Sequence, residues 1–249
     1  MQTLAQYRDR FVWATGKVIH DKPDKVIGDL SSNLADTLWE LGENIQREIL
    51  MSSPYLSPAP RAFEKIGEMT GEGVTYRLLT NSLASTDSVP AHSIYAKYRK
   101  KLLQQGVEVY ELKPDAVTRN IHNAKTVSQA RLSLHAKAVI FDRKIVYVGS
   151  YNFNKAGRNL SMETGLVVYS PELAEQTIAV IEEDMKPENS WHVVLDKQTD
   201  TQTPNRNSGF VWITERDGEQ IRYDYEPESD IWRDLGNVFF SLFPLQEKL

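Results

Sequence analysis

The stretch RLSLHAKAVIFDRKIVYVGSYNFNKAGRNLSMETGLVVY, residues 131–169, decides the fold that we predict for this chain. Residues 132–142 and 145–149 within it are rich in β-branched and apolar side chains, which is typical of strands. Side chains two positions apart on a strand share a face, so His135 and Lys137 are expected to point the same way. The two runs therefore predict a hairpin that presents an imidazole and an ammonium side by side.

The register of this hairpin depends on its turn. A two-residue turn at residues 143–144 places Lys137 opposite Ser150. The same register places His135 opposite Asn152, so that four polar side chains gather on one face. The other face is expected to lie in a core and carries Leu134, Ala136, Ala138 and Ile140.

The four polar side chains suit the chemistry of a phosphate ester. Lys137, Ser150 and Asn152 supply an ammonium, a hydroxyl and an amide, all hydrogen-bond donors that can bind the oxygens of a substrate phosphate. A neutral nitrogen of His135 can attack phosphorus and form a covalent intermediate. The chain has no cysteine and no H-E-x-x-H pattern, so neither a metal site nor a cofactor is expected. The alternative is a structural hairpin that buries one hydrogen-bonded histidine.

The spacing H-x-K-x4-D-x6-G-S-x-N closely resembles the HKD motif of the phospholipase D superfamily. This resemblance implies that His135 is the nucleophile and forms a phosphohistidine. It implies that Lys137 and Asn152 hold phosphate oxygens, with Ser150 beside them.

Two acidic residues also take their expected roles from this resemblance. Asp142 belongs to the catalytic motif and has a mainly structural part in the family. Glu163 resembles the family's carboxylate that orients the catalytic histidine, as a triad aspartate does. The segment NFNKAG, residues 152–157, departs from the D-P-R-S of synthase-type members and is nearer to single-motif, nuclease-like members.

The rest of the chain alternates between predicted helices and strands, which indicates βαβ units with helices packed on a sheet. A helix capped by Ser31 or Ser32 would carry an apolar face from Leu34 to Ile49, and Ser229 would cap an amphipathic last helix. That helix bears a Trp- and Phe-rich stripe, which we expect to dock onto the body; contact with lipid or a partner is the alternative. Predicted strands cover residues 48–53, 74–80, 107–112 and 191–195, predicted helices cover 91–105 and 171–185, and residues 210–227 form a hairpin.

Loops that follow the ends of parallel strands commonly build sites in such folds. We therefore expect residues 53–55, residues 81–82 and Glu111 to neighbour the hairpin. Residues 97–131 carry eight basic residues against three acidic ones, which predicts a basic approach for an anionic substrate beside an acidic segment at residues 215–234. Two ordinary solvated faces are the alternative.

The resemblance extends over residues 24–249, which together are similar to the C-terminal half of a two-motif cardiolipin synthase-like protein. It implies a phospholipase D-like α/β/α sandwich with a mixed central sheet and a C-terminal hairpin-helix extension. We expect a linker-like segment at residues 1–27, a catalytic half-domain with one HKD motif at residues 28–196, and an extension at residues 197–249 packed on the same domain.

Charge and hydropathy limit how the protein could bind nucleic acid or a membrane. The formal charge of −5 argues against indiscriminate binding of nucleic acid. No signal peptide and no run of about 20 apolar residues is recognisable, so contact with a bacterial membrane would be peripheral.

Displacement at phosphorus needs a nucleophile on one side and an acid for the leaving oxygen on the other. The chain has one convincing HKD motif, so the second is expected from a homodimer or from a separate N-terminal half. The first functional expectation is a phosphatidyltransferase or phospholipase acting on phospholipid. The second is a phosphodiesterase acting on nucleic acid, and the third is a non-catalytic half-domain.

Overall fold

The computed structural model describes residues 10–26, 32–118, 131–196, 209–216, 218–243 and 245. Within these ranges the strands are β1 Thr15–His20, β2 Glu48–Ser52, β3 Thr75–Asn81, β4 Glu108–Leu112, β5 Ala138–Phe141, β6 Ile145–Gly149, β7 Thr164–Tyr169, β8 Ser190–Leu195, β9 Phe210–Arg216 and β10 Glu219–Tyr223. The helices are η2 Pro23–Val26, α1 Asn33–Glu43, α2 Pro60–Gly71, α3 Val89–Gln104, α5 Lys155–Asn159, α6 Pro171–Met185 and α7 Ile231–Ser241.

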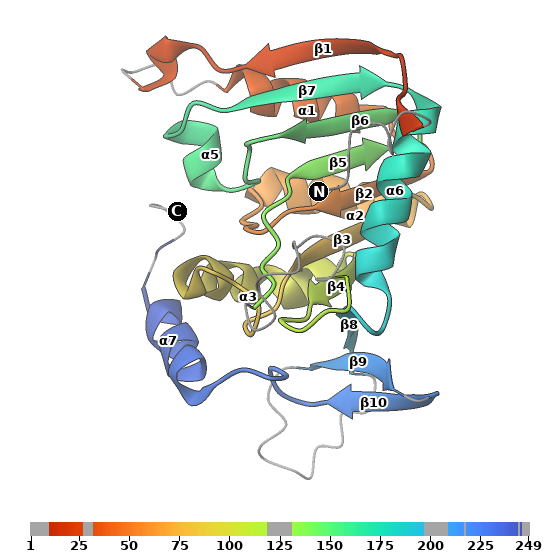
Figure 1. Cartoon of the computed structure of the whole chain (residues 1–249). Helices are drawn as coiled ribbons and strands as arrows, with labels where there is room; N and C mark the ends of the chain where they lie inside the picture. Colours follow the sequence, from red (N-terminus) through yellow and green to blue (C-terminus); the bar gives the residue numbers. More distant parts are fainter. Residues whose placement is uncertain are drawn as a thin grey trace, which may run out of the picture.

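All the described strands belong to one sheet, in the order β1-β7-β6-β5-β2-β3-β4-β8-β9-β10 (Figure 1). The pairs β2–β3 and β3–β4 are parallel, and the other neighbours are antiparallel. The expected mixed central sheet is therefore confirmed. The sheet also runs unbroken into the C-terminal hairpin of β9 and β10.

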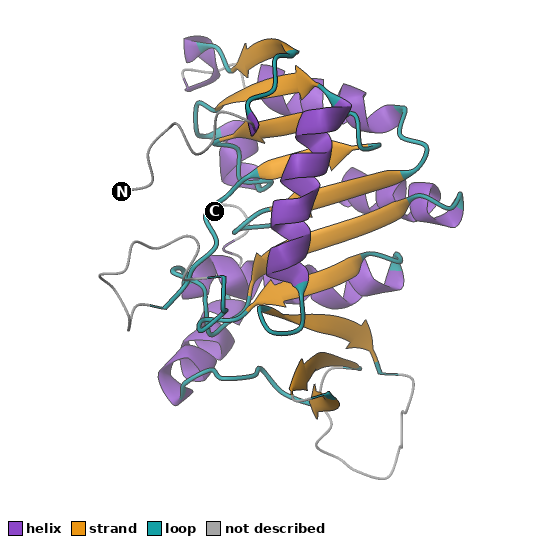
Figure 2. Ribbon diagram, turned by 45° about the vertical axis from the view of Figure 1, so that its right-hand side comes forward, coloured by secondary structure: helices purple, strands orange, loops and turns teal. Residues whose placement is uncertain are grey.

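Helices cover both faces of this sheet because its central strands alternate their side chains between two apolar cores. Leu50 of β2 packs with residues of α6 such as Ile178. Its neighbours Ile49 and Met51 face the other core, with residues of α1, α2 and α3. Figure 2 shows α6 crossing one face of the strands, with helices behind them on the other. The α/β/α sandwich expected from the resemblance is confirmed.

Two expectations about the first 50 residues need correction. The segment expected to be linker-like contains β1, which pairs antiparallel with β7 along its whole length, from Thr15↔Tyr169 to His20↔Thr164. Ser32 caps α1 by accepting a hydrogen bond from Ala35 N, but the helix ends at Glu43, and Ile49 belongs to β2. Residues 1–9 and 27–31 lie outside the described residues.

The last helix also differs from the prediction. Asp230, rather than Ser229, caps α7 by accepting a hydrogen bond from Arg233 N. Arg233 donates to the carbonyls of Leu83 and Thr86 at 2.9 and 2.8 Å, which fastens α7 to the loop after β3. The apolar stripe does not dock onto the body as expected: Ile231, Trp232, Leu235, Val238, Phe239 and Leu242 are 55–80% exposed.

None of the helices in the described ranges is long and apolar enough to cross a lipid bilayer.

Candidate active site

His135 and Lys137 of the HKD motif lie at the edge where β2 and β3 end. β5 runs antiparallel to β2, and Ala138 at the start of β5 pairs with Ser52 at the end of β2. Residues 131–137 form no regular strand, although a longer strand was expected there. The segment with His135 and Lys137 therefore meets the carboxyl ends of parallel strands, where sheets of this kind commonly place their sites.

The hairpin register is one residue off our prediction, and Asp142 explains the difference. Phe141 pairs with Ile145, so the turn contains three residues. Asp142 leaves the ladder because its N–H bonds to Glu48 O at 2.9 Å, while its carboxylate accepts the N–H groups of residues 46–48 at 2.7–3.0 Å. Gly149 N consequently bonds to Lys137 O, and Lys137 lies opposite Gly149 rather than Ser150.

These hydrogen bonds also locate Asp142 relative to the other motif residues. It follows β5 whereas Lys137 precedes it, so the two are separated by the length of the strand, about 3.3 Å per residue. Burial raises the pKa of Asp142, but the three backbone N–H groups outweigh burial and hold the pKa below its ordinary value. The structure thus places Asp142 away from the other candidates, where it joins the turn to the start of β2.

His135 is exposed to solvent, and its backbone segment is held in place. Asn81, the last residue of β3, donates to Leu134 O at 3.0 Å and accepts from Leu134 N at 2.8 Å. The His135 ring meets Tyr55 edge to face, with centroids 6.3 Å apart and planes at 78°. Among the described residues, no hydrogen bond to the imidazole nitrogens is present. The ring is therefore accessible and free to meet a substrate.

Lys137 places its ammonium against the backbone carbonyl of this histidine. Its side chain is 8% exposed, and Nζ donates to His135 O at 2.8 Å. Burial lowers the pKa of Lys137, and the nearby carboxylates of Glu163 and Asp87 offset this only in part. Asp87 also accepts a 2.5 Å hydrogen bond from the Tyr55 hydroxyl. One acid is thus close to both the lysine and the tyrosine that contacts His135.

Ser150 and Glu163 join the ends of the two neighbouring strands. The Ser150 hydroxyl donates to the Glu163 carboxylate and accepts from Thr164 N at 3.0 Å. Gly149 is needed just before this contact, because a Cβ there would come within 2.5 Å of Thr164 O. Because Gly149 has no side chain, β6 and β7 approach closely enough to hold Ser150 against Glu163.

A buried ion pair between Asp21 and Lys25 holds the backbone of Glu163. Asp21 accepts a hydrogen bond from Glu163 N at 3.1 Å and donates its own N–H to Glu163 O at 2.9 Å. Lys25 Nζ lies 2.5 Å from the Asp21 carboxylate and also donates to the carbonyls of Gly157 and Ser161. Burial raises the pKa of Asp21, but Lys25 and backbone donors outweigh it and lower the pKa overall.

Asn152 follows Ser150 by two residues in the loop after β6. Its amide oxygen is buried and makes no hydrogen bond with the described residues. The amide oxygen therefore has no structural hydrogen-bond partner among the described residues. Together, an exposed imidazole, a nearby ammonium and the side chains of Ser150 and Asn152 form a set that can receive a phosphate ester.

Sequence reasoning identified some of the supporting residues and missed others. Tyr55 and Asn81 adjoin the hairpin as expected from their places after β2 and β3. Glu111 does not, because it pairs instead with Arg99. Asp87 and Asp21 were missed. The four-residue spacing of Asp21 and Lys25 was a usable signal, but it was interpreted as part of a linker.

The expected basic approach is weaker than the charge count indicated. Arg99 and Lys113 are buried, and Lys113 donates to Pro187 O and Thr214 Oγ1 inside the protein. Arg119 and Lys125 lie outside the described residues. Glu226 of the acidic segment is the ion-pair partner of Arg99, so part of the charge asymmetry is neutralised internally.

Comparisons with known proteins show the family to which this chain belongs. A family described as "Cardiolipin synthase, PLD-like domain" matches residues 42–185. Cardiolipin synthase C of Escherichia coli (strain K12) is 30% identical over 238 residues, which are 94% of this chain and 48% of that protein. The chain spans about half the length of the curated relatives it matches.

Solved structures also match this chain at low sequence identity. Phosphatidylserine synthase of Haemophilus influenzae Rd KW20 matches with a TM-score of 0.51 and 14% identity, covering 73% of this chain and 41% of that chain. The phospholipase D family member Nuc of Salmonella typhimurium has a TM-score of 0.47 and 19% identity, covering 70% of this chain and 97% of that one. With the match over residues 42–185, the chain belongs to the cardiolipin synthase, PLD-like domain family of the phospholipase D superfamily.

Proposed function

We propose that the chain transfers phosphodiester groups of phospholipids through a phosphohistidine at His135. The observation that carries this proposal is the exposed His135 imidazole at the carboxyl edge of β2 and β3, with the Lys137 ammonium bonded to the His135 backbone carbonyl. A nucleophile needs an accessible nitrogen, and charge that develops on phosphate oxygens needs a fixed cation nearby. Both conditions are met by side chains that the fold holds in place.

In the first step, a nitrogen of His135 forms a bond to phosphorus, and the bond from phosphorus to the leaving alcohol oxygen breaks. Lys137 and Asn152 stabilise the charge on the phosphate oxygens, with Ser150 beside them, and an acid protonates the leaving alcohol. In the second step, a lipid hydroxyl or water loses its proton to a base and attacks phosphorus. The bond from phosphorus to nitrogen then breaks, which regenerates the histidine.

Glu163 has the role of a positioning residue in this proposal. Its carboxylate is hydrogen-bonded to Ser150, and its backbone N–H and carbonyl are held by Asp21. A carboxylate in this position favours the positive charge of both Lys137 and an imidazolium. Asp142 acts only through the fold of the hairpin turn.

A second half-site supplies the acid for the leaving group. His135 lies on the side of attack and cannot protonate a group that leaves on the opposite side at the same time. A second copy of this chain or a separate N-terminal half would provide the missing histidine. The proposal is supported by the sequence, in which the H-x-K-x4-D pattern occurs once, at His135.

Parallel turnover assays of the full chain test the function. We expect release or transfer of the head group from phosphatidylglycerol vesicles, with little cleavage of single- or double-stranded DNA under the same conditions. Cleavage of DNA without action on phosphatidylglycerol would replace the lipid substrate by nucleic acid. Inactivity on both, together with a monomeric mass by light scattering, would favour a half-domain that needs a partner.

A further inference from the structure

A pocket of about 520 Å³ lies between α1 and α2, on the sheet face opposite α6. Its walls are largely apolar and include Leu38, Ile49, Met51, Ile66, Leu78 and Phe141. Protein interiors are close-packed, with few voids larger than a water molecule. A volume of this size falls instead in the range of about 300–1,000 Å³ that is typical of small-molecule sites.

The pocket adjoins the candidate active site through two loops. Leu56 and Ser57 line the pocket and directly follow Tyr55, whose ring contacts His135. Phe153 lines it as well and directly follows Asn152. Ser57 N donates to Phe153 O at 3.0 Å, so the two loops are joined at this end of the pocket. Neighbouring Cα atoms are about 3.8 Å apart, which places one end of the pocket next to the phosphate-binding candidates.

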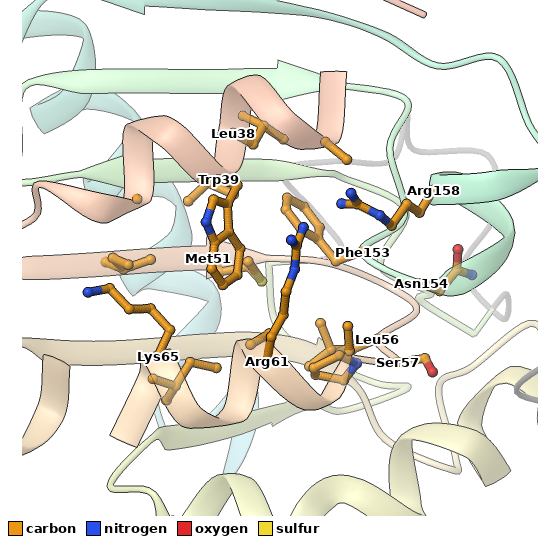
Figure 3. A pocket seen from close by; sticks show the side chains of 18 of the residues that line it. Leu38, Trp39, Met51, Leu56, Ser57, Arg61, Lys65, Phe153, Asn154 and Arg158 are labelled. Carbon is orange, nitrogen blue, oxygen red and sulfur yellow. The ribbon is translucent and has the colours of Figure 1, made fainter. Parts of the chain in front are cut away.

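Basic side chains surround the apolar walls. Arg61 lies over the Trp39 ring, with its guanidinium carbon 4.4 Å from the ring centroid. Figure 3 shows these two side chains lying together across the pocket, with Arg158, Asn154 and Ser57 toward one end and Lys65 toward the other. The charged lining residues are Arg61, Lys65, Lys155 and Arg158 against the single acid Glu43; Asp36, outside the lining, pairs with Arg158 at 2.7 Å and with Arg61 at 4.0 Å.

We propose that this pocket binds an acyl chain of the phospholipid whose phosphodiester group lies at His135. The inference rests on the proposed function and specifies its substrate. Apolar walls suit a hydrocarbon chain, and the excess of cations suits the anionic head group at its end. Nucleic acid has no aliphatic chain to fill such a pocket, so its lining favours lipid.

Gly42 offers a way to fill the pocket without disturbing the fold. It lines the pocket near the end of α1, and a Cβ added there meets no atom within 4 Å. Phenylalanine is also a better helix former than glycine. Gly71 at the end of α2 is a matched control, because it has the same open surroundings and does not line the pocket.

The test measures binding of dodecyl phosphate, below its micelle concentration, and of inorganic phosphate to the full chain by calorimetry. We expect the unmodified chain to bind dodecyl phosphate at least roughly tenfold more tightly than inorganic phosphate, because the chain is removed from water. Gly42→Phe should weaken dodecyl phosphate binding at least about tenfold, whereas Gly71→Phe should match the unmodified chain.

Equal affinities for the two ligands, or unchanged dodecyl phosphate binding in a folded Gly42→Phe variant, would overturn the proposal. Urea unfolding checks the fold of each variant, and Ala62→Phe, at a second lining position, replaces Gly42→Phe if that variant is unfolded. Binding does not require turnover, so the two proposals can fail separately. Chain-dependent binding without activity would count against the proposed reaction, and activity on lipid without chain-dependent binding would count against the pocket.

Discussion

Two clusters of this molecule are built from the same kinds of side chain. His92 is 3% exposed, with Arg99 Nη2 3.1 Å and Glu226 3.6 Å from its Nε2. Arg99 also lies 2.8 Å from both Glu111 and Glu226. His135 likewise has a cation, acids and a tyrosine nearby, but its ring is exposed and has no polar partner among the described residues.

The comparison teaches that residue type alone does not separate a structural cluster from a reactive one. In the His92 cluster, Tyr95 and Trp212 each donate to Glu111 at 2.8 Å, so the buried carboxylate is well satisfied. Removing one partner of such a network leaves an uncompensated charge, which makes its role structural. It joins α3, β4, β9 and the segment before α7, whereas the His135 imidazole is exposed and has no polar partner among the described residues.

The largest expected difference between the clusters is in catalysis. His135→Ala should reduce turnover by roughly 10³-fold or more, because it removes the nucleophile. Its free energy of unfolding should change by no more than about 0.5 kcal/mol, as for other exposed positions. His92→Ala should do the reverse, with a loss of about 1–3 kcal/mol in stability and normal turnover per folded molecule. Steady-state assays combined with urea unfolding measure both, and full activity in His135→Ala would remove it from the mechanism.

Arg99→Met should give the largest loss of stability. It leaves Glu111 and Glu226 without their shared guanidinium, so we expect the free energy of unfolding to fall by about 3–5 kcal/mol. Arg222→Met is the control, since Arg222 also contacts two acids, Asp196 and Asp224, but at the surface. The control should lose at most about 1 kcal/mol. Similar losses in the two variants, measured by urea denaturation, would show that burial does not distinguish these ion pairs.

Acidification should weaken the His92 cluster through Glu226. Burial raises the pKa of Glu226, but Arg99 and His92 outweigh burial and lower the pKa to about 2. A carboxyl group with a lowered pKa stabilises the fold above its ordinary pKa, and this contribution is lost as pH falls toward the folded value. The unmodified chain should therefore lose more stability than Glu226→Gln between about pH 5 and pH 2. Parallel unfolding curves across this range would contradict the assignment.

The smallest expected effect is on the alkaline side of the activity profile. Because burial lowers the pKa of Lys137, the ammonium should lose its proton, and turnover should fall, below the ordinary lysine pKa of 10.5. Lys137→Arg keeps its charge at high pH, so the alkaline decline should move upward, although a guanidinium fits the site differently and lowers maximal turnover. Profiles of kcat/KM against pH measure the shift, and an unmoved alkaline limb would assign it to another group.

Much of the fold could be predicted because periodicity and turn chemistry act locally. The strands β2, β3, β4, β6 and β8 and the helices α3 and α6 lie within a few residues of their predicted ranges. The hairpin register was wrong because Asp142 is held by residues 46–48, almost a hundred positions away in the chain. The strand β1 was missed because its partner, β7, lies far along the sequence.

The candidate site was also predictable only in part, namely where its residues lie close together in the sequence. The spacing of the HKD pattern identified His135 and Lys137 as candidates, and the resemblance to the family added Glu163. It contained no information about Asp21 and Asp87, which reach the site from other parts of the chain. The catalytic role of His135 and Lys137 and the positioning role of Glu163 remain predictions for the assays above.

By itself, the sequence determined the HKD side chains at the site and the order of most strands and helices, because both follow from residue types at short spacing. Only the tertiary structure decided which histidine is buried and paired and which is open to solvent. The pocket between α1 and α2 was likewise visible only in the tertiary structure. Burial and pairing depend on contacts between residues that are distant in the chain, and the sheet brings these residues together.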